Sequence, residues 1–380
     1  MKSESRAVSE RFYRPEIDGL RFFAFLAVYL RHTIGFGIGG SHHHVPNWLG
    51  DLLGTVGIAG DFGVDLFFVL SSYLITELLM RERSVRGELD IRAFYIRRIL
   101  RIWPLYFFFI AVALIMTALV PSEGLTWKHL LGLLFFAGNW VFMLMPVSSI
   151  AVPLWSIAIE EQFYILWPWV VRRLSANGVG LCAMALIVIA ACTTLAVGNV
   201  GNVEFVRLSS LTRLDGIAVG ALLAVILQGR VPRLPGSARI AIVLAAIALL
   251  LWIAHDFGLF DPPVRLLQMV LGWPLAAAAC GGILFSVLGS SGRLSAVLRS
   301  RPVIYLGRIS FGLYVFHELP LRIGDYLFPK YNESPSQMLG RFVFGLALTV
   351  PIAAASYQWL ELPFLRLKRK RFTVVPSRPD

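Results

Sequence analysis

About eleven apolar segments, most of them near 20 residues long, follow one another along this 380-residue chain, and an α-helix of that length crosses a bilayer. They run over roughly 20–38, 62–80, 99–120, 130–147, 154–171, 179–198, 210–228, 238–256, 265–289, 303–326 and 340–361. Charged residues make up 15% of the chain, whereas a soluble protein carries about a quarter. The segments therefore predict an all-α, polytopic membrane helical bundle and exclude a large soluble protein with a hydrophobic core.

Lysine and arginine gather in short clusters between these segments. The clusters lie at Arg6–Arg14, Arg81–Arg98, Arg172–Arg173, Arg230–Arg239, Arg293–Arg301 and Arg366–Arg371. Because cytoplasmic loops carry the excess of Lys and Arg, all of them should face the cytoplasm. One segment between the second and third clusters therefore cannot cross, and we expect 130–147 to be re-entrant because Gly138, Asn139 and Pro146 interrupt it. The pattern predicts about ten spans with both termini cytoplasmic.

Three parts are expected: a cytoplasmic N-terminal segment over 1–18, a membrane domain over 19–365 and a basic cytoplasmic tail over 366–380. The first part is polar and basic and lacks the apolar core of a cleaved signal peptide, so the first span should act as an uncleaved signal. The net charge of +12 comes from Lys and Arg beside apolar segments. This pattern predicts contact with anionic membrane lipids and no binding of nucleic acid, and it leaves the oligomeric state open.

Arg21 and His32 are the ionisable ends of one otherwise apolar stretch, GLRFFAFLAVYLRH. At about 1.5 Å of rise per residue, the imidazole lies roughly 16 Å along a helix from the guanidinium, and both groups share one face. Ionisable side chains inside a membrane usually face a cavity or a partner. We therefore predict a charged mouth at Arg21 and a general base, His32, deeper in the membrane. The alternatives are a snorkelling arginine and a histidine at the outer headgroups.

A second arginine cluster, Arg97, Arg98 and Arg101, lies where a loop enters the span FYIRRILRIWPLY. One interpretation is positive-inside anchoring, with Trp103 and Tyr106 as an interfacial belt. The other is a phosphate clamp, because guanidinium groups match phosphate oxygens in a bidentate way. Arg21 is expected at the same depth, so Arg21, Arg98 and Arg101 are our candidates for binding one polyphosphate.

Two apolar segments contain carboxylates. Asp65 lies in GVDLFFVLSSYLIT, and Glu160 and Glu161 lie together in PLWSIAIEEQFYILWP. A carboxylate inside a membrane must pair or be neutralised. Asp65 and Glu160 are therefore either structural partners or the groups that orient the catalytic histidine.

Weaker signals come from three further places. Arg213 and Asp215, in RLDGIAVGALLA, indicate a packing seam with a local ion pair. His317 and Glu318 stand before a helix-breaking proline, and we leave them open between an acceptor site and structural pairing. The triplet His42–His44 is expected to bind metal only adventitiously, and we predict no designed metal site.

The three cysteines all lie within apolar segments, and their spacing is not that of metal ligands. We expect Cys182, Cys192 and Cys280 to act as small apolar side chains without forming disulfides.

In their order along the chain these motifs resemble the acyltransferase-3 family of integral membrane O-acyltransferases. The resemblance extends from about 14 to 370 and rests on the spacing of Arg21 and His32, GVDLFFVLSSYLI, RRILRIWPLY, LWSIAIEEQFYILWP, LDGIAVGALLA, ISFGLYVFH and the closing ELPF. The chain departs from the family at Ser71-Ser72, where Ser-Gly is usual, so a looser helix contact is expected there. The periplasmic hydrolase-like domain that some members carry is not expected from these residues.

The resemblance implies transfer of an acyl group, usually acetyl, from cytoplasmic acyl-CoA to a hydroxyl. The acceptor would be a surface glycan, a lipid-linked sugar or a macrolide, and Trp140, Trp155 and Trp273 suit either a sugar or a macrolide ring. His32 matches the family's catalytic histidine. Arg21, Arg98 and Arg101 match its donor-binding arginines.

The residues and the resemblance together give a mechanism in which His32 deprotonates the acceptor hydroxyl. Asp65 or Glu160 would fix its tautomer, as the carboxylate does in hydrolytic triads. Direct attack on the thioester and a relay through an acyl-histidine both remain open. A different class of function is a proton-coupled transporter or flippase for a glycan or small anion, in which the same groups would relay protons.

Overall fold

The computed structural model describes residues 13–34, 47–120, 124–198, 203–255, 257, 265–328 and 335–372, which are helices and short connections without a strand. The all-α fold expected from the sequence is confirmed. In chain order the helices are α2 (Pro15–Thr33), α3 (Asn47–Ala59), α4 (Phe62–Arg86), α5 (Ile91–Leu119), α6 (Trp127–Leu134), α7 (Gly138–Leu144), α8 (Leu154–Arg173), α9 (Ala176–Gly198), α10 (Val203–Leu208), α11 (Leu214–Leu227), α12 (Gly236–Ala254), α13 (Leu266–Val287), α14 (Arg293–Leu298), α15 (Arg301–Arg308), α16 (Ser310–Phe316), α17 (Glu318–Leu327), α18 (Pro335–Ser356), the π-helix η1 (Tyr357–Glu361) and α19 (Leu362–Phe372).

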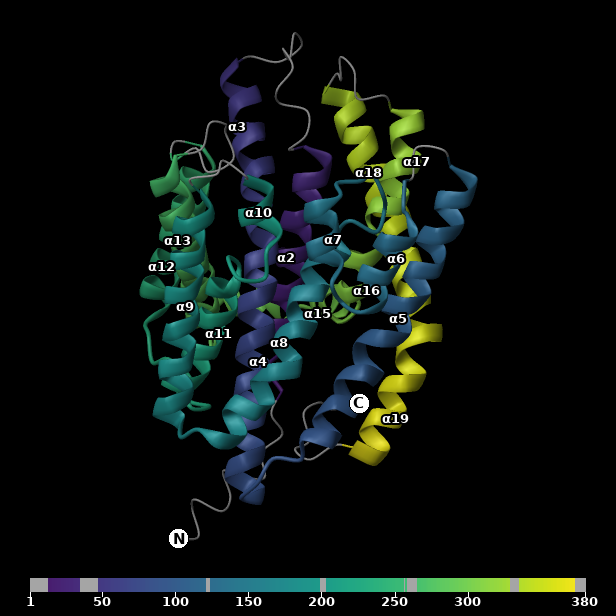
Figure 1. Cartoon of the computed structure of the whole chain (residues 1–380). Helices are drawn as coiled ribbons and strands as arrows, with labels where there is room; N and C mark the ends of the chain where they lie inside the picture. The colour runs from purple at the N-terminus through teal and green to yellow at the C-terminus, as the bar shows by residue number, and fades with distance from the viewer. Residues whose placement is uncertain are drawn as a thin grey trace.

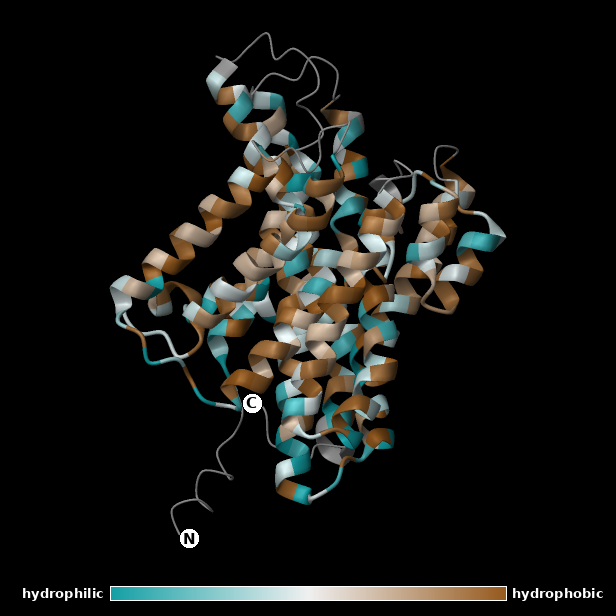
Figure 2. Ribbon diagram, turned by 60° about the vertical axis from the view of Figure 1, so that its left-hand side comes forward, coloured by the Kyte–Doolittle hydropathy of each residue, from teal (hydrophilic) through white to brown (hydrophobic). Residues whose placement is uncertain are grey.

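Among the described residues, 6 helical segments are long and apolar enough to cross a membrane. They are Trp48–Arg86, Ile91–Leu119, Ala176–Gly198, Gly236–Ala254, Leu266–Val287 and Ser336–Lys368. The expected number of about ten spans is not confirmed. Two of the other expected spans form helices α2 and α8, which carry several charged residues, and 303–326 is divided among α15, α16 and α17. Figure 2 shows hydrophilic residues set among the brown apolar ribbons of the bundle.

One end of the bundle is basic. Helices α4 and α8 both end there, at the lower side of Figure 1, and α5 begins beside them. The last turn of α4 contains Arg83 and Arg86, and the last turn of α8 contains Arg172 and Arg173. We call this the basic end and the opposite side, where α17 and α18 meet in Figure 1, the far end.

Helix α4 packs closely against α11 at the position where the sequence departs from the family pattern. A side chain at Gly220 of α11 would collide with the hydroxyl of Ser72 and the carbonyl of Val69. The Ser72 hydroxyl turns back to its own helix and donates to the carbonyl of Phe68 at 2.8 Å. The looser contact expected at Ser71-Ser72 is therefore not seen, because the glycine on the partner helix supplies the space.

The segment 130–147 forms two short helices, α6 and α7, in place of one span. The break between them contains Phe136 with a φ of 53°, a left-handed conformation that ends α6. The amide of Asn139 in α7 donates to the carbonyl of Leu208 at 3.0 Å, and Gln162 of α8 donates to Asn139 at 3.0 Å. The interrupting residues thus hold an irregular segment against α8, as expected for backbone that protein groups must satisfy.

Candidate active site

A cavity of about 660 Å³ opens between α2, α4, α5, α8, α16 and α19. Arg21, Arg98 and Arg101 all line it, so the three arginines singled out in the sequence meet at one place. The sequence analysis did not assign to this site its other cationic lining residues, which are Arg14, Arg308, Arg366 and Lys368. They come from the start of α2, the end of α15 and helix α19, which only the fold brings together.

The arginines of this cavity meet aromatic and acidic side chains. The guanidinium of Arg98 lies 5.7 Å from the ring centre of Phe94 and 5.8 Å from that of Tyr164. Arg101 lies 3.8 Å from the buried carboxylate of Glu361, the last residue of the π-helix η1. Single π-helical turns are frequent at functional sites. Glu361 belongs to the closing ELPF motif, so that motif places a carboxylate beside the arginines.

Glu160 and Glu161 point to different surroundings. Glu160 lines the cavity and accepts a hydrogen bond of 2.9 Å from the Tyr164 hydroxyl. Glu161 is buried and lies 3.3 Å from the indole nitrogen of Trp103, which donates to it. Glu160 therefore faces the arginine-lined cavity.

Tyr314 connects the cavity with the histidines. Its hydroxyl lines the cavity with Ser156, 2.7 Å from the Ser156 hydroxyl. Its ring centre lies 5.8 Å from that of His317, and the ring of His317 lies 4.9 Å from that of His32. The three rings thus form a row of packed side chains from Tyr314, which lines the cavity, to His32, which is not among its lining residues.

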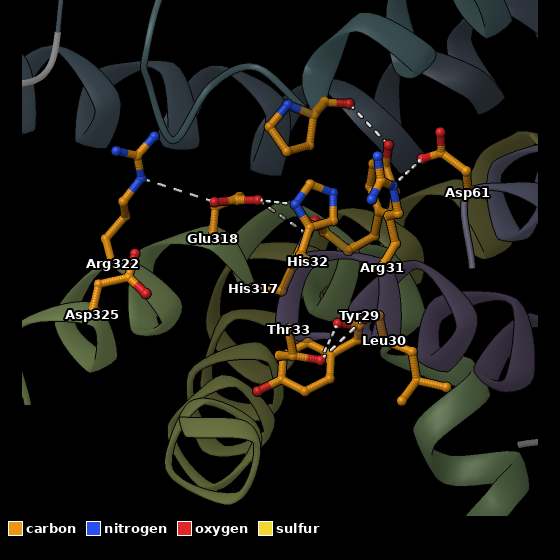
Figure 3. A network of polar contacts seen from close by, with 12 residues as sticks. Tyr29, Leu30, Arg31, His32, Thr33, Asp61, His317, Glu318, Arg322 and Asp325 are labelled. Atoms are coloured by element: carbon orange, nitrogen blue, oxygen red, sulfur yellow. Dashed lines mark hydrogen bonds and ion pairs between the residues drawn. The ribbon is translucent and has the colours of Figure 1, made fainter. Parts of the chain in front are cut away.

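The carboxylate against His32 is Glu318, the first residue of α17 (Figure 3). Nδ1 of His32 pairs with Oε1 of Glu318, whose Oε2 lies 4.0 Å from Nε of Arg322. The two side chains are only slightly exposed, at 21% for His32 and 14% for Glu318. A carboxylate on Nδ1 holds the proton there and leaves Nε2 to accept a proton. The sequence analysis assigned this contact to Asp65 or Glu160, whereas the structure places Glu318 there.

Asp65 belongs to a different, fully buried ion pair. Its Oδ1 accepts a hydrogen bond of 2.8 Å from Arg213, so the expected local pair of Arg213 with Asp215 is in fact a bond between α11 and α4. The Arg213 guanidinium stacks 3.6 Å from the ring centre of Trp273 and 5.9 Å from that of Trp155. Both tryptophans are buried around this cation, so they do not form an open platform for a sugar or macrolide ring.

The predicted interfacial belt is also partly internal. Tyr106 is fully buried and donates to the carbonyl of Leu133 at 2.8 Å.

The histidine triplet His42–His44 lies outside the described residues. Metal-ligating groups do come together elsewhere, at His32, His317 and Glu318.

Comparison with known proteins places the chain in a family. Residues 14–358 match the family described as "Acyltransferase domain". The chain belongs to this family. The membership confirms the resemblance to the acyltransferase-3 family that the ordered motifs carry.

The curated relatives are O-acetyltransferases. O-acetyltransferase OatA of Staphylococcus aureus (strain NCTC 8325 / PS 47) is 26% identical over 393 residues, which cover 96% of this chain and 59% of the relative. A second relative, named "Putative O-acetyltransferase SAS0844", from Staphylococcus aureus (strain MSSA476), is 25% identical over 394 residues, with the same coverage of 96% and 59%. The chain thus spans somewhat more than half the length of these relatives. No solved structure is similar to it.

Proposed function

We propose that the chain is a membrane O-acyltransferase that transfers an acyl group from acyl-CoA to a hydroxyl of an acceptor molecule. The acyl group that we propose is acetyl. The observation that carries this proposal is the arginine-lined cavity together with the packing of its lining residue Tyr314, through His317, against the pair His32 and Glu318. The printed names of the relatives, both O-acetyltransferases, favour acetyl as the group transferred.

Donor binding is assigned to the basic end. Arg21, Arg98 and Arg101 offer a set of guanidinium groups to the phosphates of CoA, which favours a polyphosphate ligand over a neutral one. Basic loop clusters face the cytoplasm in membrane proteins, so we expect this end and both termini on the side that contains acyl-CoA. The pantetheine arm would extend through the cavity toward Ser156 and Tyr314.

The chemical step is assigned to the far end of α2. His32 Nε2 takes the proton of the acceptor hydroxyl, and the oxygen attacks the thioester carbonyl. The carbon–sulfur bond then breaks, and the CoA thiolate leaves and recovers the proton from His32. Glu318 holds the His32 tautomer and stabilises the imidazolium that forms, as the carboxylate does in hydrolytic triads. The acceptor is expected to be a carbohydrate, a lipid-linked sugar or a macrolide that reaches His32 from the far end.

The test is transfer of labelled acetyl from acetyl-CoA by the purified protein in lipid nanodiscs, with glycan, lipid-linked sugar and macrolide acceptors supplied in parallel. Labelled acceptor and free CoA are expected to form in equal amounts. The matched control is His32→Gln, which keeps the size of the side chain but not the base. Movement of an acceptor or anion across a sealed membrane without acetylation would identify the transporter alternative and overturn the proposal.

A further inference from the structure

His32, His317 and Glu318 bring three metal-ligating groups together beside the chemical end of α2. One ligand atom from each, a ring nitrogen of each histidine and a carboxylate oxygen, lies within 4.8 Å of the others. In Figure 3 the side chain of His32, on α2, points toward His317 and Glu318. These two residues are adjacent in the chain, where α16 ends and α17 begins. Two imidazoles and one carboxylate are the ligand set of three-ligand zinc sites, in which water occupies the fourth position.

The tautomer of His317 suits it for binding a metal. Its Nδ1 lies 2.6 Å from the carbonyl oxygen of Tyr314, and because a carbonyl only accepts, Nδ1 carries the proton. The lone pair is therefore on Nε2, which lies 3.8 Å from Oε1 of Glu318. His317 is fully buried, and its Nε2 has no hydrogen-bond partner within the described part of the chain. Metal-ligating histidines commonly donate their other ring N–H to a carbonyl in this way.

The charges around Glu318 decide on which side an ion would bind. Arg322 lies 4.0 Å from Oε2, so a cation is repelled from that oxygen. Oε1 is on the side of both imidazoles, at His32 and 3.8 Å from His317. Because zinc binds nitrogen and oxygen at about 2.0–2.2 Å, three ligand atoms within 4.8 Å of one another can contact one ion after small shifts of the side chains.

We propose that His32, His317 and Glu318 form a site for Zn²⁺ whose occupation inhibits acyl transfer. The inhibition rests on the proposed function, because an ion on Nδ1 of His32 leaves Nε2 protonated, so that Nε2 cannot accept the proton of the acceptor hydroxyl. Coordination of Nδ1 replaces the hydrogen bond between His32 and Glu318, and the ring proton moves by exchange with water from Nδ1 to Nε2. The phosphate-binding arginines line a different region, so donor binding is retained.

The experiment measures metal binding directly, with Co²⁺ as a spectroscopic probe and Zn²⁺ as its competitor. The full chain is purified without a histidine tag, and His42, His43 and His44 are replaced by Asn in every sample. One equivalent of Co²⁺ is expected to give visible absorption bands of four- or five-coordinate cobalt, which Zn²⁺ abolishes. His317→Gln and Glu318→Gln should each raise the Kd by about 10-fold or more. His255→Gln, which changes an exposed histidine at the end of α12, is the matched control and should leave the Kd unchanged.

Two results would overturn the site: no saturable Co²⁺ binding by folded protein, or binding that His317→Gln leaves unchanged. Zn²⁺ is expected to lower kcat for acetyl transfer while leaving the KM for acetyl-CoA unchanged. Full activity of the zinc-loaded protein would overturn the inhibition. If the metal-free protein transfers nothing, the proposed function fails, whereas the Co²⁺ titration still decides on the site by itself.

Discussion

At the scale of single residues, the structure assigns the buried carboxylates of this chain to different partners. Glu318 pairs with His32, Asp65 pairs with Arg213, and Glu160 faces the arginine-lined cavity. All three are acidic residues in apolar surroundings, so sequence alone treats them alike. Substitution of these residues should have different effects, because Glu318 supports the proton acceptor His32, whereas Asp65 neutralises the buried guanidinium of Arg213.

Substitution of Glu318 by Gln should lower kcat for acetyl transfer by about 10²-fold and leave the KM for acetyl-CoA unchanged. The amide has lost the charge that stabilises the imidazolium, whereas the donor cavity is intact. Substitution of His32 by Gln should remove the base itself and lower kcat by about 10²–10⁴-fold. Initial rates over a range of acetyl-CoA concentrations check both. A Glu318→Gln protein with unchanged kcat would remove this carboxylate from the mechanism.

Substitution of Asp65 by Asn should act on folding. It leaves Arg213 buried without its negative partner, and breaking a buried ion pair costs about 3–5 kcal/mol. Thermal unfolding in detergent should show a lower Tm, with activity lost in proportion to the unfolded fraction. A protein of unchanged Tm that has lost only kcat would instead give Asp65 the role at His32 that the sequence first suggested.

At the scale of helices, the cavity depends on elements that are distant in the chain. Helix α19 contacts α5, and the adjoining π-helix carries Glu361 to within 3.8 Å of Arg101. Residues of α19 complete the cavity wall beside the arginines of α2 and α5. The ELPF motif is therefore expected to serve the donor site, although it lies at the opposite end of the chain from Arg21.

Substitution of Arg98 or Arg101 by Gln should raise the KM for acetyl-CoA by about 10-fold, because each removes a charge-assisted bond to phosphate of about 1.5–3 kcal/mol. Isothermal titration with CoA should show the same factor in Kd. Arg172→Gln is the matched control, since it removes a basic-end arginine at the end of α8, outside the lining of this cavity. An unchanged KM in both test variants would reduce Arg98 and Arg101 to membrane anchors.

At the scale of the whole molecule, the uneven distribution of charge predicts an orientation. The basic end should face the cytoplasm, because positively charged loops are retained there. The His32–Glu318 pair then lies toward the other leaflet, at the opposite end of α2 from the arginines. Acyl-CoA would bind from the cytoplasmic side and the acceptor from the opposite side. Helix α2 would span the distance between the two binding regions.

Single cysteines introduced at Arg172 and Ser336 should report this orientation, in a background whose 3 native cysteines are replaced by alanine. Both positions are exposed, Arg172 at the basic end and Ser336 at the start of α18. A membrane-impermeant maleimide applied to intact cells should label Ser336→Cys, and Arg172→Cys only after the membrane is opened. The reverse pattern would place the basic end outside and remove acyl-CoA as the donor.

Sequence by itself determined the fold class, the family and the arginines of the cavity. The length of an apolar segment and the positions of charged residues along the chain are local properties that the sequence states directly. The known rise of an α-helix places Arg21 and His32 toward its two ends. The number of crossing helices was less accessible, because the sequence predicts spans at 20–38 and 154–171, whereas the helices formed there, α2 and α8, carry several charged residues and are not among the 6 apolar segments long enough to cross.

Only the tertiary structure decided which carboxylate meets His32 and which basic residues join the cavity. Glu318 is distant in the chain from His32, and Arg308 and Arg366 are also distant from Arg98. Periodicity places a side chain on a helix face, but the neighbour of that face depends on how the helices pack. Close approaches such as that of Gly220 to Ser72 fix this packing.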